Sequence, residues 1–259
     1  MGILIVFNLI LILLITGTLV CVKKWMRSER ARHVLLLVVP LLTIVCHYSL
    51  MLYYVLFTSD ALAYISDTPN LILPMYPCNV AMWCALFYGL LHDKQSRLAL
   101  LLSDYLFWFG LISTLVGMFA NVDFIINPTL SNFETTKSIV AHATLLFNLL
   151  LIPVFGYLRP DFFRNMRNIT VSVIAMYVIG LYCNLVFSAL AGPQVAYDEN
   201  AMFILHSPFE QLPYLRYPLI AAIGLLLYFI LFWIYDVITA PRGGRWYDRA
   251  LAAIRQKRA

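Results

Sequence analysis

The chain has 259 residues, of which 62% are hydrophobic and 12% charged, and it carries a formal net charge of +5. This composition offers too little polar surface to cover a water-soluble globule of that length, so a soluble globular domain is excluded. Apolar runs of about 20 residues, whose backbone must satisfy its own N–H and C=O groups, predict an all-α, polytopic membrane protein rather than a β-barrel.

Taken in chain order, the apolar windows predict seven transmembrane helices. We expect them at residues 3–22, 34–57, 71–91, 98–120, 138–157, 169–190 and 219–235. No basic residue precedes the first window, and Lys23 and Lys24 follow it directly, so we expect a retained signal anchor rather than a cleaved signal peptide. Residues 1–240 are therefore expected to form a transmembrane domain, and residues 241–259 a basic cytoplasmic tail.

The basic residues predict how the chain is oriented in the membrane. All 18 Lys and Arg residues except Lys137 and Arg216 fall in one set of alternate connections or in the C-terminal tail. The positive-inside rule then places the N-terminus outside and the C-terminus in the cytoplasm of a multi-pass protein of the cell membrane. Because the basic residues are spread over separate loops, the net charge indicates orientation, and no nucleic-acid partner is expected.

The C-terminal tail combines basic residues with a hydrophobic stripe. The sequence RWYDRALAAIRQKR, from Arg245 to Arg258, is typical of an amphipathic helix that lies on a membrane surface. We expect this helix to contact the anionic headgroups of the inner leaflet. The alternative is a frayed, solvated end of the chain.

The sequence contains none of the motifs that commonly bind a metal or a nucleotide cofactor. There is no HExxH, GxSxG, P-loop or dinucleotide fingerprint, and no His/Cys cluster with zinc spacing. The five cysteines all lie in apolar segments without a CxxC pair, so no disulfide framework is expected. The sequence therefore predicts no cofactor and no metal.

Polar side chains inside the predicted spans are the first candidates for function, since each costs free energy unless it meets a partner or water. Cys78, His142 and Asn184 fall at a similar depth below the outer surface, on three different spans. A thiol beside an imidazole would form a nucleophile with its base, and Asn184 would orient the imidazole. The plainer alternatives are a cysteine that packs as a small hydrophobe and an asparagine that links two helices.

The same outer third of the spans holds candidates for substrate binding, namely His47, Tyr76, Asn79 and Asn121. Pro74 and Pro77 flank Tyr76 in the third predicted span, and each proline frees a backbone carbonyl group at membrane depth. This pattern favours a broken helix that lines a cavity. The alternative is a proline-kinked packing helix.

Four short segments share their order and spacing with a known family. They are residues 73–78 (LPMYPC), 127–130 (NPTL), His142 with 156–160 (GYLRP), and Asn184 with 200–203 (NAMF) and Pro208. They resemble the YwaF-like family of bacterial integral membrane proteins, which is distantly similar to a eukaryotic transmembrane acyltransferase acting on lyso-ether phospholipids. The family often carries His or Gln where this chain has Tyr76, and a leucine-like residue where it has Pro77.

The resemblance implies cysteine-dependent chemistry. Cys78 would be the acyl-accepting nucleophile and His142 its general base, while Asn200 and Phe203 would contribute to substrate binding. The first hypothesis is therefore an intramembrane acyltransferase or transacylase, with Asn184 or Asn200 at the developing oxyanion. Its partners would be membrane lipids of the outer leaflet, and residues 191–216 would act as a lid.

Two other classes of function stay open. A transporter or a small-molecule or lipid-binding protein would use the same polar residues to line an outward-facing cavity. A receptor or assembly subunit would present its acidic outer loops and basic inner loops to protein partners. The sequence predicts no particular oligomeric state.

Overall fold

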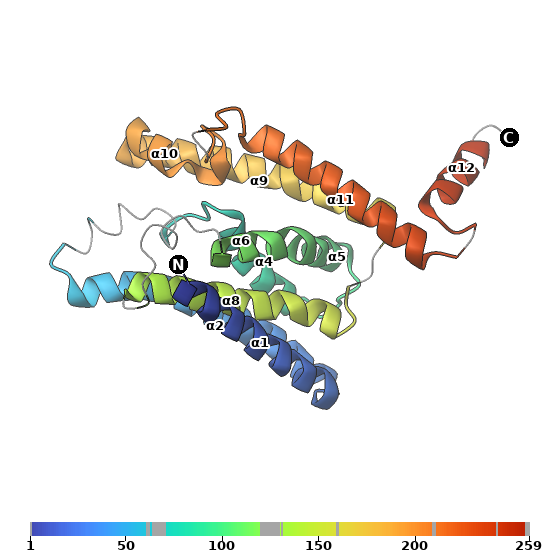
Figure 1. The fold of residues 1–259 in the computed structure, drawn as a ribbon, viewed down its shortest axis with the longest axis horizontal. Coiled ribbons are helices and arrows are strands. Elements are labelled where there is room, and N and C mark those ends of the chain that lie inside the picture. The colour runs from blue at the N-terminus through green and yellow to red at the C-terminus, as the bar shows by residue number, and fades with distance from the viewer. Residues whose placement is uncertain are drawn as a thin grey trace.

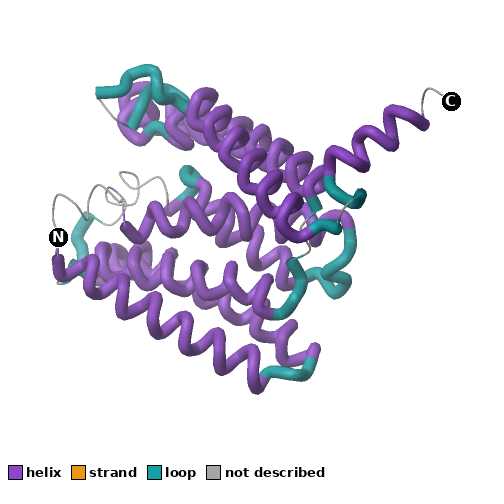
Figure 2. Tube along the Cα trace, turned by 45° about the vertical axis from the view of Figure 1, so that its right-hand side comes forward, coloured by secondary structure: helices purple, strands orange, loops and turns teal. Residues whose placement is uncertain are grey.

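The computed structural model describes residues 2–60, 63, 71–119, 130, 132–158, 161–208, 211–241 and 243–256. These residues form helices joined by turns and loops, and none of them lies in a β-strand, which confirms the predicted all-α fold (Figure 2). The helices in chain order are α1 (Gly2–Trp25), α2 (Glu29–Phe57), α4 (Pro77–Leu90), α5 (Arg97–Asp104), the π-helix η2 (Tyr105–Gly110), α6 (Leu111–Phe119), α8 (Phe133–Val154), α9 (Phe162–Ala191), α10 (Pro193–Glu199), the 3-10 helix η3 (Ala201–Phe203), α11 (Tyr217–Thr239) and α12 (Trp246–Gln256).

Six helical segments of the described chain are long and apolar enough to cross a membrane. They are α1, α2, the continuous run α5–η2–α6, α8, α9 and α11, and they correspond to six of the seven predicted spans. The third predicted span, residues 71–91, differs because its helix α4 has only 14 residues. Seven full-length transmembrane helices are therefore not confirmed.

Two prolines account for the shortness of α4. Residues 71–76 are not α-helical, and α4 begins at Pro77, directly after Tyr76, whose backbone is extended. Proline suits the first turn of a helix because its missing N–H has no intrahelical partner there, whereas Pro74 and Pro77 both oppose a helix that passes through them. The predicted span is thus broken at the prolines, and the break places a helix N-terminus inside the bundle.

The helices pack in three layers (Figure 1). Helices α1, α2 and α8 lie along one face, with α1 and α2 both packed against α8. The pair α9 and α11 forms the opposite face, and α4, α5 and α6 lie between the two faces. Helix α12 extends away from the bundle beyond the end of α11 (Figure 1). The middle layer is therefore the part of the fold that can present residues to both faces at once.

The middle layer contains a π-helical turn, η2, between α5 and α6. At its start, the hydroxyl of Tyr105 donates to the carbonyl oxygen of Pro77 at 2.9 Å and so fixes the beginning of α4. At its end, the carbonyl oxygen of Gly110 accepts from the hydroxyls of Ser113 at 2.9 Å and Thr114 at 2.7 Å. Turns of this kind are frequent at functional sites.

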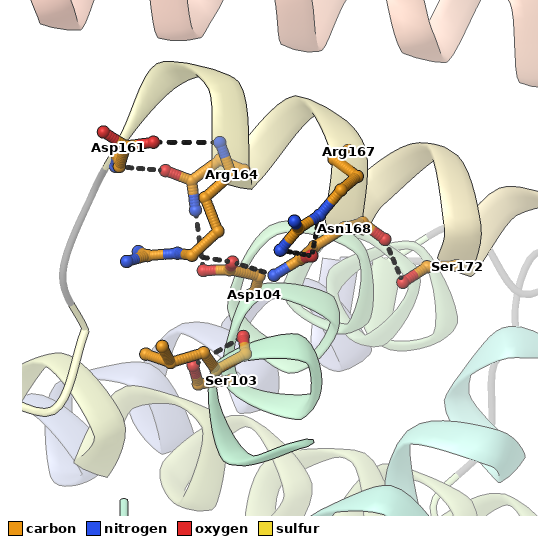
Figure 3. A network of polar contacts seen from close by, with 9 residues as sticks. Ser103, Asp104, Asp161, Arg164, Arg167, Asn168 and Ser172 are labelled. Atoms are coloured by element: carbon orange, nitrogen blue, oxygen red, sulfur yellow. Dashed lines mark hydrogen bonds and ion pairs between the residues drawn. The ribbon is translucent and has the colours of Figure 1, made fainter. Parts of the chain in front are cut away.

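A buried carboxylate joins the middle layer to α9 (Figure 3). The side chain of Asp104, at the end of α5, has no exposed surface and pairs with the Nε atom of Arg164 at 3.4 Å. Its oxygens also accept from the side-chain amides of Asn165 at 2.6 Å and Asn168 at 2.8 Å. A charge in an apolar bundle is tolerated where such partners surround it. The network therefore holds α5 against the first turns of α9.

A buried lysine holds the connection between α4 and α5. The ammonium of Lys94 donates to the carbonyl oxygens of Tyr88 at 2.5 Å, Gly89 at 3.2 Å and Leu91 at 2.6 Å. These carbonyl groups lie at the end of α4 and directly after it, and that of Tyr88 also accepts from the N–H of Leu91 at 3.3 Å. Lys94 therefore acts as a C-terminal cap. Burial lowers the pKa of Lys94 to about 8.

The C-terminal tail is attached to the bundle through two residues near its beginning. Trp246 stacks on Phe162, with ring centroids 4.8 Å apart and an interplanar angle of 16°. Arg249 pairs with Asp161 and Asp236 at 3.0 Å each, and it thereby bridges the start of α9 and the end of α11. No residue of α12 is buried, and its contact with anionic headgroups stays a prediction.

Candidate functional site

A cavity of about 1050 Å³ lies between the middle layer and the two faces of the bundle. Its polar and charged wall residues are Thr43, His47, Tyr76, Cys78, Asn79, Ser113, Glu134, Lys137, Ser138, His142, Asp198, Glu199, Tyr217 and Tyr228. One face of α11 supplies much of the apolar wall, with Ile220, Ile223, Leu227 and Leu231. The volume and the mixed lining suit a ligand that has a polar end and a long apolar portion.

Cys78 is the second residue of α4, directly after Pro77. The N–H of Asn79 donates to the carbonyl oxygen of Tyr76 at 3.0 Å. The side-chain oxygen of Asn79 also accepts from the N–H of Tyr76 at 3.2 Å, which steadies this helix start. The free N–H groups and the partial positive charge of a helix N-terminus favour an anion. The thiol therefore lies at the positive end of the α4 dipole.

His142 lines the same cavity from α8. Its Nδ1 atom lies 2.8 Å from the carbonyl oxygen of Ser138, one turn earlier in the helix. Because a carbonyl oxygen only accepts, Nδ1 carries the proton of the neutral ring and Nε2 is left with a lone pair. The Nε2 edge lies against Gly117 of α6, where a Cβ atom would collide with the ring. The imidazole is thus held between two helices, with its Nε2 edge against the backbone of Gly117.

The segment after α9 contributes to the cavity wall through α10 and η3. The hydroxyl of Tyr76 donates to the carbonyl oxygen of Glu199 at 3.2 Å, and the N–H of Met202 donates to that of Met75 at 3.0 Å. Phe203 lies beside Tyr76, with ring centroids 5.9 Å apart. These contacts tie the segment to the residues that precede Cys78.

Two asparagines fix the shape of this segment. The side chain of Asn184, on α9, accepts from the N–H of Ala201 at 3.0 Å and donates to its carbonyl oxygen at 3.1 Å. The side chain of Asn200 accepts from the N–H of Leu205 at 2.9 Å and donates to the carbonyl oxygen of His206 at 2.8 Å. Neither asparagine lines the cavity formed by the described residues. Both side-chain amides therefore hold the segment in position without lining the cavity themselves.

The backbone of this segment is strained at three residues. Asn200, Met202 and Phe203 have φ angles of 47°, 56° and 55°, in the left-handed region that residues other than glycine rarely adopt. Each such residue costs about 1–3 kcal/mol. Gly180 of α9 makes room for the conformation, because a Cβ atom there would collide with the side chain of Met202. The hydrogen bonds of the two asparagines hold the backbone in this state.

The structure brings most of the sequence-predicted site residues to one cavity wall, namely Cys78, His142, His47, Tyr76, Asn79 and Phe203. Asn184 and Asn200 lie outside that wall, and Asn121 falls outside the described residues. Sequence reasoning did not place Lys137 or Gly117 in the candidate site. Lys137 lies five residues before His142 on the same helix, about 140° away around the helix axis, so helical periodicity does not place the two residues on one face. For Gly117, the sequence indicates only a small residue that would allow close contact between helices.

The cavity wall offers one thiol and two imidazoles. All five cysteines are free, and Cys78 is the one that lines the cavity. His47 faces the cavity from α2, and His142 faces it from α8. Within the described ranges, no three His, Cys, Asp or Glu side chains are grouped so that they could hold a metal ion.

Comparison with known proteins identifies a family for most of the chain. The model of the TMEM164 family matches residues 1–235, a range that includes every residue of the cavity wall. No curated protein sequence and no solved structure matches the chain.

Proposed function

The chain belongs to the TMEM164 family of membrane proteins, and we propose that it is an intramembrane acyltransferase or transacylase that acts on phospholipid acyl chains. The observation that carries the proposal is that Cys78 of α4 and His142 of α8 line one cavity. A thiol and an imidazole in one site are the minimum for covalent acyl transfer. The resemblance of residues 73–78 to the YwaF-like proteins points to the same chemistry.

In the first step, Nε2 of His142 takes the proton of the Cys78 thiol, and the thiolate attacks the ester carbonyl carbon of a phospholipid. The N–H of Cys78, together with the positive end of the α4 dipole, stabilises the negative charge that develops on the carbonyl oxygen. The ester C–O bond then breaks, and the proton on His142 passes to the departing oxygen. The products are a lysophospholipid and a thioester on Cys78.

In the second step, a lysolipid hydroxyl attacks the thioester carbonyl while His142 takes the hydroxyl proton. The C–S bond breaks, and Cys78 leaves as a thiolate that recovers the proton from the imidazolium. The acyl chain is now on the acceptor, and both side chains have returned to their starting states. His142 alternates between base and acid, a task that suits imidazole near neutral pH.

The distribution of polarity along the cavity wall supports a lipid substrate. The apolar face of α11 offers a track for an acyl chain, whereas Glu134 and Asp198 lie where α8 begins and α10 ends. With the N-terminus outside, as the basic residues predict, this charged end would lie at the outer leaflet. We therefore infer substrates from the outer leaflet of the cell membrane, with the basic tail on the anionic inner leaflet.

Intact-protein mass spectrometry tests the proposal. The detergent-purified protein, incubated with a defined phospholipid, should gain an acyl-sized adduct that hydroxylamine removes, and Cys78→Ala should gain none. Cys84→Ala is the matched control, because Cys84 lies on the same helix but outside the cavity wall, and it should behave as wild type. His142→Gln should slow adduct formation about 100-fold or more.

An absent adduct, together with unchanged phospholipid and lysolipid pools in a turnover assay, would overturn the acyltransferase proposal. The same cavity would then serve a transporter or a lipid-binding protein, whose activity depends on the wall but not on the thiol. In that case Cys78→Ala keeps ligand binding, while His142→Ala loses it.

A further inference from the structure

One buried cation in the cavity wall has no part in the acyl-transfer steps. Lys137 of α8 lines the cavity and is only 9% exposed. Among the residues that the structure describes, no hydrogen bond or ion pair engages its ammonium group. Most of the Lys137 side chain is buried, which is rare for lysine, while its Nζ atom keeps some accessible surface in the cavity. An anionic group of a ligand in the cavity would supply a partner for the ammonium.

The other charges in the wall come from three carboxylates. Glu134 lies three residues before Lys137 on α8, and Asp198 and Glu199 come from the end of α10. Glu134 and Asp198 are exposed, so water screens their charges, and Glu199 is half-buried. Together they oppose the entry of a small free anion. A lipid overcomes this opposition because its acyl chains are driven into the apolar part of the cavity.

The spacing along α8 selects the kind of anion. Lys137 precedes His142 by five residues, which is a rise of roughly 7.5 Å along the helix. In a glycerophospholipid, the phosphate is joined to the ester carbonyl by only a few bonds of the glycerol backbone. An ester carbonyl held at Cys78 and His142 therefore brings the phosphate to the level of Lys137, whose flexible stem and compact charge can follow it.

We propose that Lys137 binds the phosphate of a glycerophospholipid and so positions the ester carbonyl at Cys78, an inference that rests on the acyltransferase proposal. Lys137 is then a positioning residue for the substrate and takes no part in bond breaking. The chemical class that it selects is a lipid phosphodiester, in preference to a neutral diacylglycerol that carries the same acyl chains.

Lipid binding to Cys78→Ala tests this inference apart from catalysis, because that variant cannot form the thioester. Native mass spectrometry in non-ionic detergent would compare dioleoyl phosphatidylglycerol with dioleoylglycerol. Adding Lys137→Gln should weaken phosphatidylglycerol binding roughly tenfold to a hundredfold and leave dioleoylglycerol binding unchanged, whereas Lys137→Arg should keep most of the affinity. Arg216→Gln, at an exposed basic residue outside the cavity wall, is the matched control and should change neither affinity.

An equal loss of both lipids in Lys137→Gln would assign the lysine to packing and overturn the inference. Displacement of phosphatidylglycerol by inorganic phosphate at similar concentrations would assign the site to a soluble anion instead of a lipid. A preference for phosphatidylglycerol that depends on Lys137, without any acyl adduct on wild type, would sustain the phosphate site and reject acyl transfer. An adduct on wild type, with lipid preference unchanged in Lys137→Gln, would sustain acyl transfer and reject the phosphate site at Lys137.

Discussion

The imidazole of His142 lies against the backbone of Gly117, at a point where any Cβ atom would collide with the ring. The opposite nitrogen of the ring is already held by the carbonyl oxygen of Ser138. The contact with Gly117 therefore removes much of the remaining freedom of the ring. The general base of the proposed reaction is placed by a residue that has no side chain.

Gly117→Ala should displace the imidazole and slow acyl-adduct formation about 100-fold, because a shift of about 1 Å at a catalytic group has an effect of that size. A mass-spectrometric time course measures the rate, and circular dichroism checks the fold. Gly224→Ala is the matched control, since Gly224 also lines the cavity but a Cβ atom there meets nothing within 4 Å. Equal rates in Gly117→Ala and wild type would contradict the role given to this contact.

Asn184→Ala should loosen the segment that follows α9. The change leaves the buried N–H of Ala201 without its partner, at a cost of about 1–3 kcal/mol, and leaves the carbonyl oxygen of Ala201 with the N–H of Ile204 at 3.4 Å. Hydrogen–deuterium exchange at residues 200–206 should rise, while α8 keeps its protection. Gln194→Ala, which breaks only an exposed hydrogen bond to Asp198, should leave this exchange unchanged. Similar exchange in both variants would show that Asn184 does not hold the segment.

Asp104→Leu should destabilise the bundle strongly. It leaves Arg164, Asn165 and Asn168 facing an apolar side chain, and breaking a buried charge network in this way costs about 3–5 kcal/mol. Thermal unfolding in detergent should show a clearly lower midpoint. Asp93→Ala, at an exposed aspartate, serves for comparison and should shift the midpoint little. A midpoint for Asp104→Leu that equals the wild-type value would be inconsistent with the network in Figure 3.

Lys94 should make stability increase with pH between about 8 and 10.5. Its pKa falls from 10.5 to about 8 on burial, so in this window the unfolded chain holds a proton that the folded protein has lost. Stability rises with pH wherever the unfolded state binds more protons, and below a pH of about 8 both states are protonated and the contribution is at its minimum. Lys94→Met should remove this rise from the unfolding midpoint.

The control for this pH dependence is Lys24→Met, which replaces an exposed lysine and should keep the wild-type slope. Other groups also titrate in this range, so the informative quantity is the difference between wild type and variant at each pH. A slope in Lys94→Met equal to that of wild type would mean that the ammonium keeps its proton in the folded protein.

The apolar runs predict six of the long helices well, because the thickness of the hydrocarbon layer sets the length of a crossing helix. The second predicted span ends at Phe57, as α2 does. The third span fails as a continuous helix because Pro74 and Pro77 outweigh the apolar character of residues 71–91. Composition indicates that a segment is buried in lipid, whereas single prolines decide whether it is one helix.

Depth along a helix can be read from sequence, but rotation about the helix axis cannot. The fixed rise per residue puts Cys78, His142 and Asn184 at similar depths, and the first two do line one cavity. Asn184 instead points to Ala201, because the packing of α9 turns it toward the following segment. Which face of each helix meets its neighbours depends on the whole bundle, and no local pattern in the sequence states it.

The π-helical turn at Tyr105–Gly110 decides which residue of α6 meets the imidazole. Each residue of an α-helix advances the chain by about 100° around the axis. If these six residues were wound as α-helix, the chain from Leu111 onward would rotate by roughly that angle, and a residue with a side chain would face His142 in place of Gly117. The π-helical hydrogen bonds, two helical turns before Gly117, thus determine whether there is room for the imidazole of His142 against α6.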